Sequence, residues 1–413
     1  MPNQHTRIVG GCLSGAAIVI VPAAEAGELD FDLELAGEMR FFPEEPAFPG
    51  QLETFQPSFT VKPDIRWDSE DRSHQVVVTP FVRVDTRDEE RTHFDLREAY
   101  YRFNSESNYS LTVGLAKVFW GRTESRHLVD IINQTDAVED IDEEDKLGQP
   151  MVNLTLLNDW GTVDLFLMSG FRDRTFPGED GRLRFSDVID TDNAIFTRDG
   201  RRASPDFAVR YSHYVGDWDF GVAGFFGTSR EPRFAFDTGG SFRPIYDRIA
   251  QASIDVQYTK DAWLWKLETI VREGQGDTFF AAVGGFEYTN YQVFGSGADL
   301  GLLLEYQYDG RDDNLVAEDF GLAIAAPITV ADNDVFAGAR LAFNDVQDTS
   351  LLAGATVDTD DGSTSVFVEA ERRIGQNWKA ELESRLFVNA DIQNPLSFFE
   401  RDDVVTFRLT RFF

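Results

Sequence analysis

Apolar and polar residues alternate one by one along much of the chain, in segments of about ten residues that polar turns separate. Segment 29–35 alternates Leu or Phe with Asp or Glu, and segments 263–272 and 378–388 alternate aromatic or aliphatic residues with charged ones. A period of two places the two kinds of residue on opposite faces of a β-strand. The pattern predicts an all-β protein.

The lengths of the connections separate two all-β architectures. A soluble sandwich would also show alternation, with its apolar face in the core. Here, however, long connections such as 42–51, 117–150 and 172–205 alternate with very short ones such as 158–159 and 216–217. This rhythm is typical of a transmembrane up-and-down antiparallel β-barrel, which has tight turns at one rim and large loops at the other.

The rhythm also predicts the number of strands. Residues 28–308 accommodate thirteen alternating segments and residues 335–413 accommodate five. The direction of successive strands is consistent only if segment 321–330, which lacks alternation and contains Pro327, belongs to an outer loop. We therefore expect about 18 strands, with about 16 as the alternative.

The N-terminus has the features of a secretory signal peptide. Arg7 precedes an apolar stretch at 8–21, and Ala24-Glu25-Ala26 is a small-x-small cleavage site. Cys12 lies before the apolar stretch, which argues against a lipid-anchored cysteine. We expect residues 1–26 to be removed, which leaves residues 27–413 as one cysteine-free barrel domain.

Membrane insertion as a barrel is favoured by three further features. After residue 26 there is no apolar run of about 18 residues, so helical spans are excluded. Trp218, Tyr258, Trp263 and Trp378 fall at the short-turn ends of strands, where an aromatic girdle is expected. The alternating tail ends on Phe413, which we expect to be the assembly signal read by the barrel-assembly machinery. The sequence thus predicts an integral protein of the Gram-negative outer membrane.

The net charge of -34 bears on partners. It excludes a nucleic-acid binder, because no basic patch is present to neutralise phosphates. Acidic residues concentrate in the long connections, above all at 136–145. These could attract cations, or bind divalent ions that bridge to lipopolysaccharide, or simply be solvated. Nothing fixes a coordination geometry, so we predict no metal site and no cofactor.

The inward faces of the predicted strands carry charges of both signs, which implies a water-filled lumen in a barrel of this width. The alternative is that these charges pair across neighbouring strands and stabilise the wall. The lumen-facing candidates are Arg83, Arg102, Arg210, Lys266, Glu268, Arg272, Glu369, Glu381, Arg385 and Arg408.

Connection 117–150 is the best candidate for control of passage. Its segment 119–133 is too apolar to extend into solvent, so we expect the loop to fold against the inner wall. It would then present Arg122, Arg126, Asp130 and Asp136 as a pore constriction. Alternatively, the loop packs on a neighbouring subunit of a homotrimer.

A resemblance supports the same class. Segments 97–101, 113–121 and 130–136, with looser similarity at 342–345 and 372–378, resemble a poorly characterised family of porin-like outer-membrane proteins of Gram-negative bacteria. The resemblance implies a barrel and a location, and carries no substrate or catalytic residue. Where such proteins often have Pro after the Asn, this chain has Gln134, so its local turn differs.

An enzyme is disfavoured, because the five histidines lie in no nucleophile, metalloprotease or phosphate-loop motif. The sequence predicts a channel for passive diffusion of small hydrophilic solutes, with cations preferred. The alternatives are a substrate-specific export or uptake pore gated by loop 117–150, and a non-conducting structural barrel.

Overall fold

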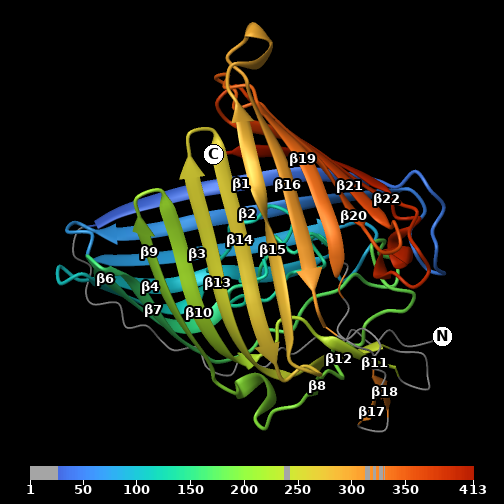
Figure 1. The fold of residues 1–413 in the computed structure, drawn as a ribbon, viewed down its shortest axis with the longest axis horizontal. Coiled ribbons are helices and arrows are strands. Elements are labelled where there is room, and N and C mark those ends of the chain that lie inside the picture. Colours follow the sequence, from blue (N-terminus) through green and yellow to red (C-terminus); the bar gives the residue numbers. More distant parts are fainter. Residues whose placement is uncertain (1–26, 237–241, 312–316, 320–321, 325–328, 330) are drawn as a thin grey trace, which may run out of the picture.

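The computed structural model describes residues 27–236, 242–311, 317–319, 322–324, 329 and 331–413. The predicted signal peptide lies outside the described residues. Most of the chain forms one closed antiparallel barrel of 18 strands (Figure 1). Each barrel strand pairs with the next barrel strand along the chain, and β1 (Gly27–Phe41) closes the circle against β23 (Val404–Phe412). The expected up-and-down barrel of 18 strands, rather than 16, is confirmed.

Between these two, the remaining barrel strands follow in chain order: β2 Phe55–Ser69, β3 His74–Asp85, β4 His93–Asn104, β5 Tyr109–Ala116, β6 Gln149–Asn158, β7 Gly161–Met168, β9 Asp206–Val215, β10 Trp218–Thr228, β13 Arg248–Lys260, β14 Trp263–Glu273, β15 Phe279–Asn290, β16 Asp299–Asp309, β19 Asn333–Ala342, β20 Ser350–Asp358, β21 Thr364–Ile374 and β22 Trp378–Val388.

A small second sheet lies outside the barrel wall. Its strands are β8 Ile195–Phe196, β11 Arg233–Phe236, β12 Phe242–Tyr246, β17 Ala317–Asp319 and β18 Leu322–Ile324. All of them belong to long connections between barrel strands. The expectation that segment 321–330 does not span is confirmed for 322–324, which form β18; residues 321, 325–328 and 330 lie outside the described residues.

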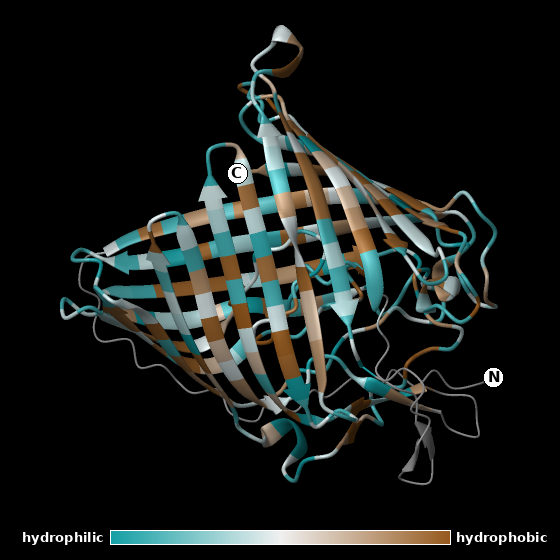
Figure 2. Cartoon of the chain, in the orientation of Figure 1, coloured by the Kyte–Doolittle hydropathy of each residue, from teal (hydrophilic) through white to brown (hydrophobic). Residues whose placement is uncertain are grey.

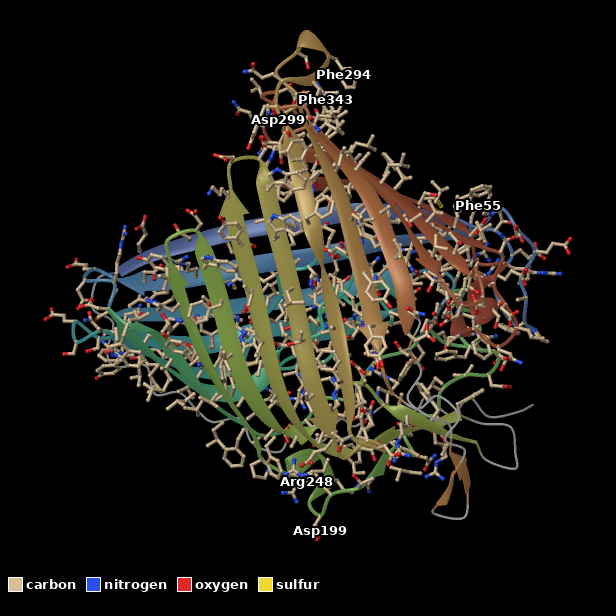
Figure 3. All side chains as sticks on the ribbon, in the orientation of Figure 1. Phe55, Asp199, Arg248, Phe294, Asp299 and Phe343 are labelled. Carbon is tan, nitrogen blue, oxygen red and sulfur yellow. The ribbon has the colours of Figure 1, made fainter. Side chains whose placement is uncertain are left out.

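The two ends of the barrel differ in their connections. Phe294 and Phe343 lie on short connections at one end, here named the turn end (Figure 3). Asp199 and Arg248 lie at the opposite end, here named the loop end, where the long connections gather (Figure 3). No helix in the described part of the chain is long and apolar enough to span a membrane.

Alternation sorts the side chains onto the two faces of the wall. On β14, Trp265 and Leu267 are 47% and 43% exposed on the outside, whereas Glu268 is 0% exposed on the inside. Figure 2 shows the resulting alternation of hydrophobic and hydrophilic residues along the strands. Aromatic rings also pair near the turn end, where exposed Trp218 and half-buried Tyr258 have centroids 4.6 Å apart. An apolar outer face with such rings is what lipid contact requires.

Candidate functional site

Residues 117–148, between β5 and β6, form an inner loop that packs inside the barrel. Most of its apolar side chains are buried because they contact apolar residues of the inner wall instead of water, whereas Phe119 is 62% exposed. The cluster joins Trp120, Leu128, Val129, Ile131 and Ile132 of the loop to Met151, Phe166, Met168, Ala208, Ala223, Phe225, Ile249, Ile270, Phe279, Ala281 and Val283. The hydrophobic run of the sequence thus has a dry surface within its own barrel.

Two wall carboxylates hold the loop backbone on the β10–β16 side. Glu268 accepts hydrogen bonds from the backbone N–H groups of Arg122 at 2.5 Å and Thr123 at 3.0 Å. Glu305 accepts one from the backbone N–H of Ser125 at 2.8 Å. Because a buried carboxylate needs donors, these backbone groups both satisfy it and fix the loop.

Arginines of the loop reinforce the same side. Arg122 pairs with Asp219 at 2.9 Å and with Asp255 at 3.2 Å. Arg126 pairs with Asp309 at 3.1 Å. Together with the hydrogen bonds to Glu268 and Glu305, these contacts tie the first half of the loop to β10, β13, β14 and β16.

The second half of the loop is held on the β1–β4 side by a buried network of charges. Arg83 donates to Glu139 at 2.9 Å and lies 3.3 Å from Glu38. Arg97 pairs with Asp136. Arg91 pairs with Glu38 at 2.7 Å. All of these side chains are buried, so the network excludes water between loop and wall.

A third attachment involves β22. Arg385 lies 3.4 Å from Asp140, 2.7 Å from Asp142 and 2.6 Å from Glu383. It therefore bridges two carboxylates of the loop and one of its own strand. Glu124 of the loop also pairs with Arg340 of β19 at 2.6 Å, which extends the β10–β16 attachment by one strand. The inner loop is attached to three sectors of the wall and crosses the lumen between them.

A cavity of about 410 Å³ remains between the inner loop, loop-end segments at 174–189 and 230–234, and the wall of β19–β22. Nine carboxylates line it: Glu124, Asp130, Asp142, Glu143, Glu144, Asp187, Glu231, Asp334 and Glu369. Six cationic side chains do so: Arg126, Lys146, Arg174, Arg184, Arg230 and Arg385. Its apolar lining includes Phe176, Phe185, Phe234, Phe336, Leu352, Phe367, Phe387 and Phe399.

An aromatic shelf forms the wall side of this cavity. The rings of Phe336 on β19 and Phe367 on β21 are stacked, with centroids 5.9 Å apart and planes 7° apart. Between them, Gly354 on β20 leaves the necessary space, since a Cβ there would collide with the Phe336 ring. A Cβ on Gly338 would lie 2.8 Å from Cζ of Phe336. The two glycines let the Phe336 ring lie flat on the wall.

The structure divides the four constriction candidates. Arg126 and Asp130 line the cavity, and Arg126 also pairs with Asp309 of the wall, whereas Arg122 and Asp136 pair with wall residues away from the cavity. Asp130 lies 3.5 Å from Lys146, and burial raises the pKa of its carboxyl. The cavity thus meets one part of the loop, while the rest of the loop is fixed against the wall.

The ten lumen-facing candidates all lie on barrel strands, and nine of them have a polar partner. The partners are Glu139 for Arg83, Thr112 for Arg102, Asp255 for Arg210, Glu124 for Lys266, loop N–H groups for Glu268, Glu231 for Arg272, Lys379 for Glu381, Asp142 for Arg385 and Glu38 for Arg408. Glu369 is the exception among the described residues.

Sequence reasoning did not single out the aromatic shelf. The available signal is an apolar residue at an inward position. Phe336 shares the inward face of its strand with Asp334 and Gly338, and Phe367 shares that of its strand with Glu369. Phe413 lies where the last strand meets the first: its backbone N–H donates to the carbonyl of Leu33 at 3.1 Å.

No protein-family model matches the chain, and no protein of curated function matches it in sequence. Solved structures match it in fold. A BenF-like porin from Pseudomonas fluorescens superposes with a TM-score of 0.52 at 9% identity, over 93% of this chain and 98% of that one. OpdQ of Pseudomonas aeruginosa gives a TM-score of 0.52 at 10% identity, over 94% of this chain and 98% of that one.

A third structure with the same fold is not described as a porin. Wzi of Escherichia coli, an outer-membrane carbohydrate-binding barrel involved in group 1 capsule assembly, has a TM-score of 0.52 at 10% identity, over 92% of this chain and 83% of that one. At such identities the similarity concerns the fold alone. In fold, the protein is a porin-like β-barrel of the outer-membrane type.

Proposed function

We propose that this protein is an outer-membrane channel through which small hydrophilic solutes diffuse passively, with cations preferred. The observation that carries the proposal is the cavity between the inner loop and the β19–β22 wall of a closed barrel. The inner loop packs against the wall at β1–β4 and β10–β16, so passage would follow this side. The diameter and the lining of such a constriction decide which solutes pass.

The charge of the cavity supports the preference for cations. Nine carboxylates and six cationic groups line it, so its field is negative. A lumen lined by an excess of one sign concentrates ions of the other sign. The net charge of -34 acts in the same direction at longer range.

The proposed location in the outer membrane rests on the fold and on the outer surface. Exposed apolar residues cover the outside of the strands, and the barrel is closed by pairing of β23 with β1. Membrane lipid and lipopolysaccharide would contact this surface, and the barrel-assembly machinery would read Phe413.

A second candidate function is a substrate-specific pore in which the inner loop acts as a gate. Attachment of the loop to three wall sectors favours it, because a loop held by discrete ion pairs can have two defined positions. A non-conducting structural barrel is the third candidate.

The deciding experiment is single-channel recording of the refolded mature protein in a planar bilayer, with the reversal potential measured under a salt gradient. Stable open steps with cation preference are the expected result. Brief openings that depend on one added solute would favour the gated pore. A folded barrel without conductance would overturn the channel proposal.

A further inference from the structure

Two pairs of like charges face each other across the β21–β22 ladder, and only one pair is neutralised. Glu371 lies opposite Glu381, and Glu369 lies opposite Glu383. Like charges directly opposite on one face of a sheet are destabilising. Lys379 resolves the first pair, since its Nζ lies 2.6 Å from Glu371 and 2.9 Å from Glu381.

The second pair lacks such a bridge. Glu383 pairs with Arg385 at 2.6 Å, and the same guanidinium also forms ion pairs with Asp140 and Asp142 of the inner loop. Within the described part of the chain, Glu369 has no ion-pair partner, although it lines the cavity. Its position therefore offers a carboxyl group without a direct ion pair to whatever enters, although Arg385 is near enough to attract it.

The cationic groups around the cavity, in contrast, are already occupied. Arg126, Lys146, Arg174 and Arg230 pair with Asp309, Asp130, Glu143 and Asp206, respectively, and Arg184 donates to backbone carbonyls. Arg385 is the shared group described above. An entering anion would meet no free cation among these residues, whereas an entering cation would meet Glu369 and also Glu144, which has no ion-pair partner in the described residues.

Apolar surface lies on the β20 side of Glu369, whereas Glu383 lies opposite it on β22. Leu352 is the ladder partner of Glu369, and Phe367 of the aromatic shelf lies two residues away on the same face of β21. Elsewhere the cavity is lined by Phe185 and Phe399, whose centroids are 6.1 Å apart. A volume of about 410 Å³ lies within the range of small-molecule sites.

We propose that this cavity is a binding subsite for small organic cations, in which Glu369 binds an ammonium or guanidinium group and Phe367 and Leu352 contact an apolar or aromatic body. The inference deepens the proposed channel function by naming a solute class. A bare metal ion gains nothing from the apolar lining, because it prefers a shell of oxygen ligands. An aromatic cation uses both halves of the site.

The test uses benzylammonium, with benzoate and ethylammonium as comparison probes, on the full mature barrel folded in detergent micelles. Calorimetric titration is expected to show binding of benzylammonium in preference to both. Glu369→Gln should weaken it about ten-fold through loss of a charge-assisted contact. Phe367→Ala should weaken benzylammonium and leave ethylammonium unchanged. Glu371→Gln is the matched control, since Lys379 already neutralises that carboxylate, and it should bind like the native protein.

Binding in micelles does not depend on conductance, so the two proposals fail separately. Conductance without benzylammonium binding, or equal binding to native protein and E369Q, overturns the subsite and leaves the channel. Binding that E369Q abolishes, in a barrel that never conducts, supports the subsite and overturns the channel. Heat-modifiable migration of each variant confirms that the barrel is folded.

Discussion

The β1–β4 side and the β19–β22 side of the lumen meet the same inner loop with opposite results. On the first side, the arginines of the wall and the carboxylates of the loop and wall pair in a buried network around Glu38 and Glu139. On the second side, Phe336, Gly354 and Phe367 of β19–β21 are uncharged, and the loop is tied beside them by Glu124 to Arg340 of β19 and by Asp142 to Arg385 of β22. The loop therefore closes one side and leaves a cavity at the other.

The difference between the two sides shows how a loop can occupy part of a polar lumen and still leave space for a solute beside it. Buried charges are tolerated only when each is paired, so the β1–β4 network is stable as a complete set and costly to break. Small and apolar wall residues need no partner and can face open space. The cavity thus lies beside uncharged wall residues, between the attachments of the loop at β19 and β22.

The largest effect is expected from Glu139→Ala, which breaks the closed side. Arg83 and Arg97 would lose a carboxylate in a buried setting, a loss that typically costs about 3–5 kcal/mol. The second half of the inner loop should detach from β3 and β4, and single-channel conductance should rise.

Glu144→Ala is the matched control for that variant, because it removes the same charge from the same loop without breaking an ion pair. It should keep the native conductance and change selectivity only. Native conductance in E139A, with a barrel shown to be folded, would mean that the buried network does not hold the loop.

The wall and the loop differed in how far the sequence predicted them. Alternation predicted the 18 strands, because a period of two is local information. The apolar segment 119–133 predicted that the loop would need a dry surface. Which sector of the wall would accept it depends on residues far apart in the chain, such as Arg83 with Glu139 or Arg122 with Asp255, and no local pattern encodes such pairs.

The cavity was missed for a related reason. Phe336 and Phe367 are apolar residues on inward faces that are otherwise largely polar. That their rings stack across Gly354 can be predicted only if the register of β19, β20 and β21 is known. In the sequence, Glu369 does not differ from the other nine lumen-facing candidates. It differs in the structure, where each of the other nine has a polar partner among the described residues.

The next effect concerns the attachment at β22. Arg385→Gln would remove the guanidinium shared by Asp140, Asp142 and Glu383, at a cost of up to about 3 kcal/mol. The freed carboxylates should make the reversal potential more cation-selective. Arg372→Gln, which removes the same charge from an exposed pair with Asp345 at the turn end, should leave it unchanged. Loss of cation selectivity in R385Q would contradict this account.

A smaller effect is expected from overpacking the shelf. In Gly354→Ala the new methyl group would collide with the Phe336 ring and force it off the wall, which typically costs about 1–3 kcal/mol. The free energy of unfolding from urea titration should fall accordingly. Gly37→Ala on β1 is the control, because a Cβ there meets nothing within 4 Å. Equal stability of the two variants would show that the shelf tolerates displacement.

The smallest effect is a dependence of selectivity on pH. Enclosure in the lumen, with the carboxylates of Glu139 and Asp140 nearby, raises the pKa of Asp145 to about 6. Asp145 is therefore charged above this pH and neutral below it, so cation preference should fall as pH drops from about 7.5 to about 5. Because the folded-state pKa is raised, the same protonation stabilises the fold at low pH, and that stabilisation is lost as pH rises through about 6.

Reversal potentials over this range should show a step that Asp145→Asn reduces. Asp71 at the turn end provides the control, since hydrogen bonds from Ser69 and Ser73 lower its pKa to about 2 and keep it charged throughout. Asp71→Asn should therefore leave the size of the step intact. A native protein with no step would mean that Asp145 faces water as freely as a surface carboxylate, and the negative field of the cavity would then rest on the groups near β19–β22 alone.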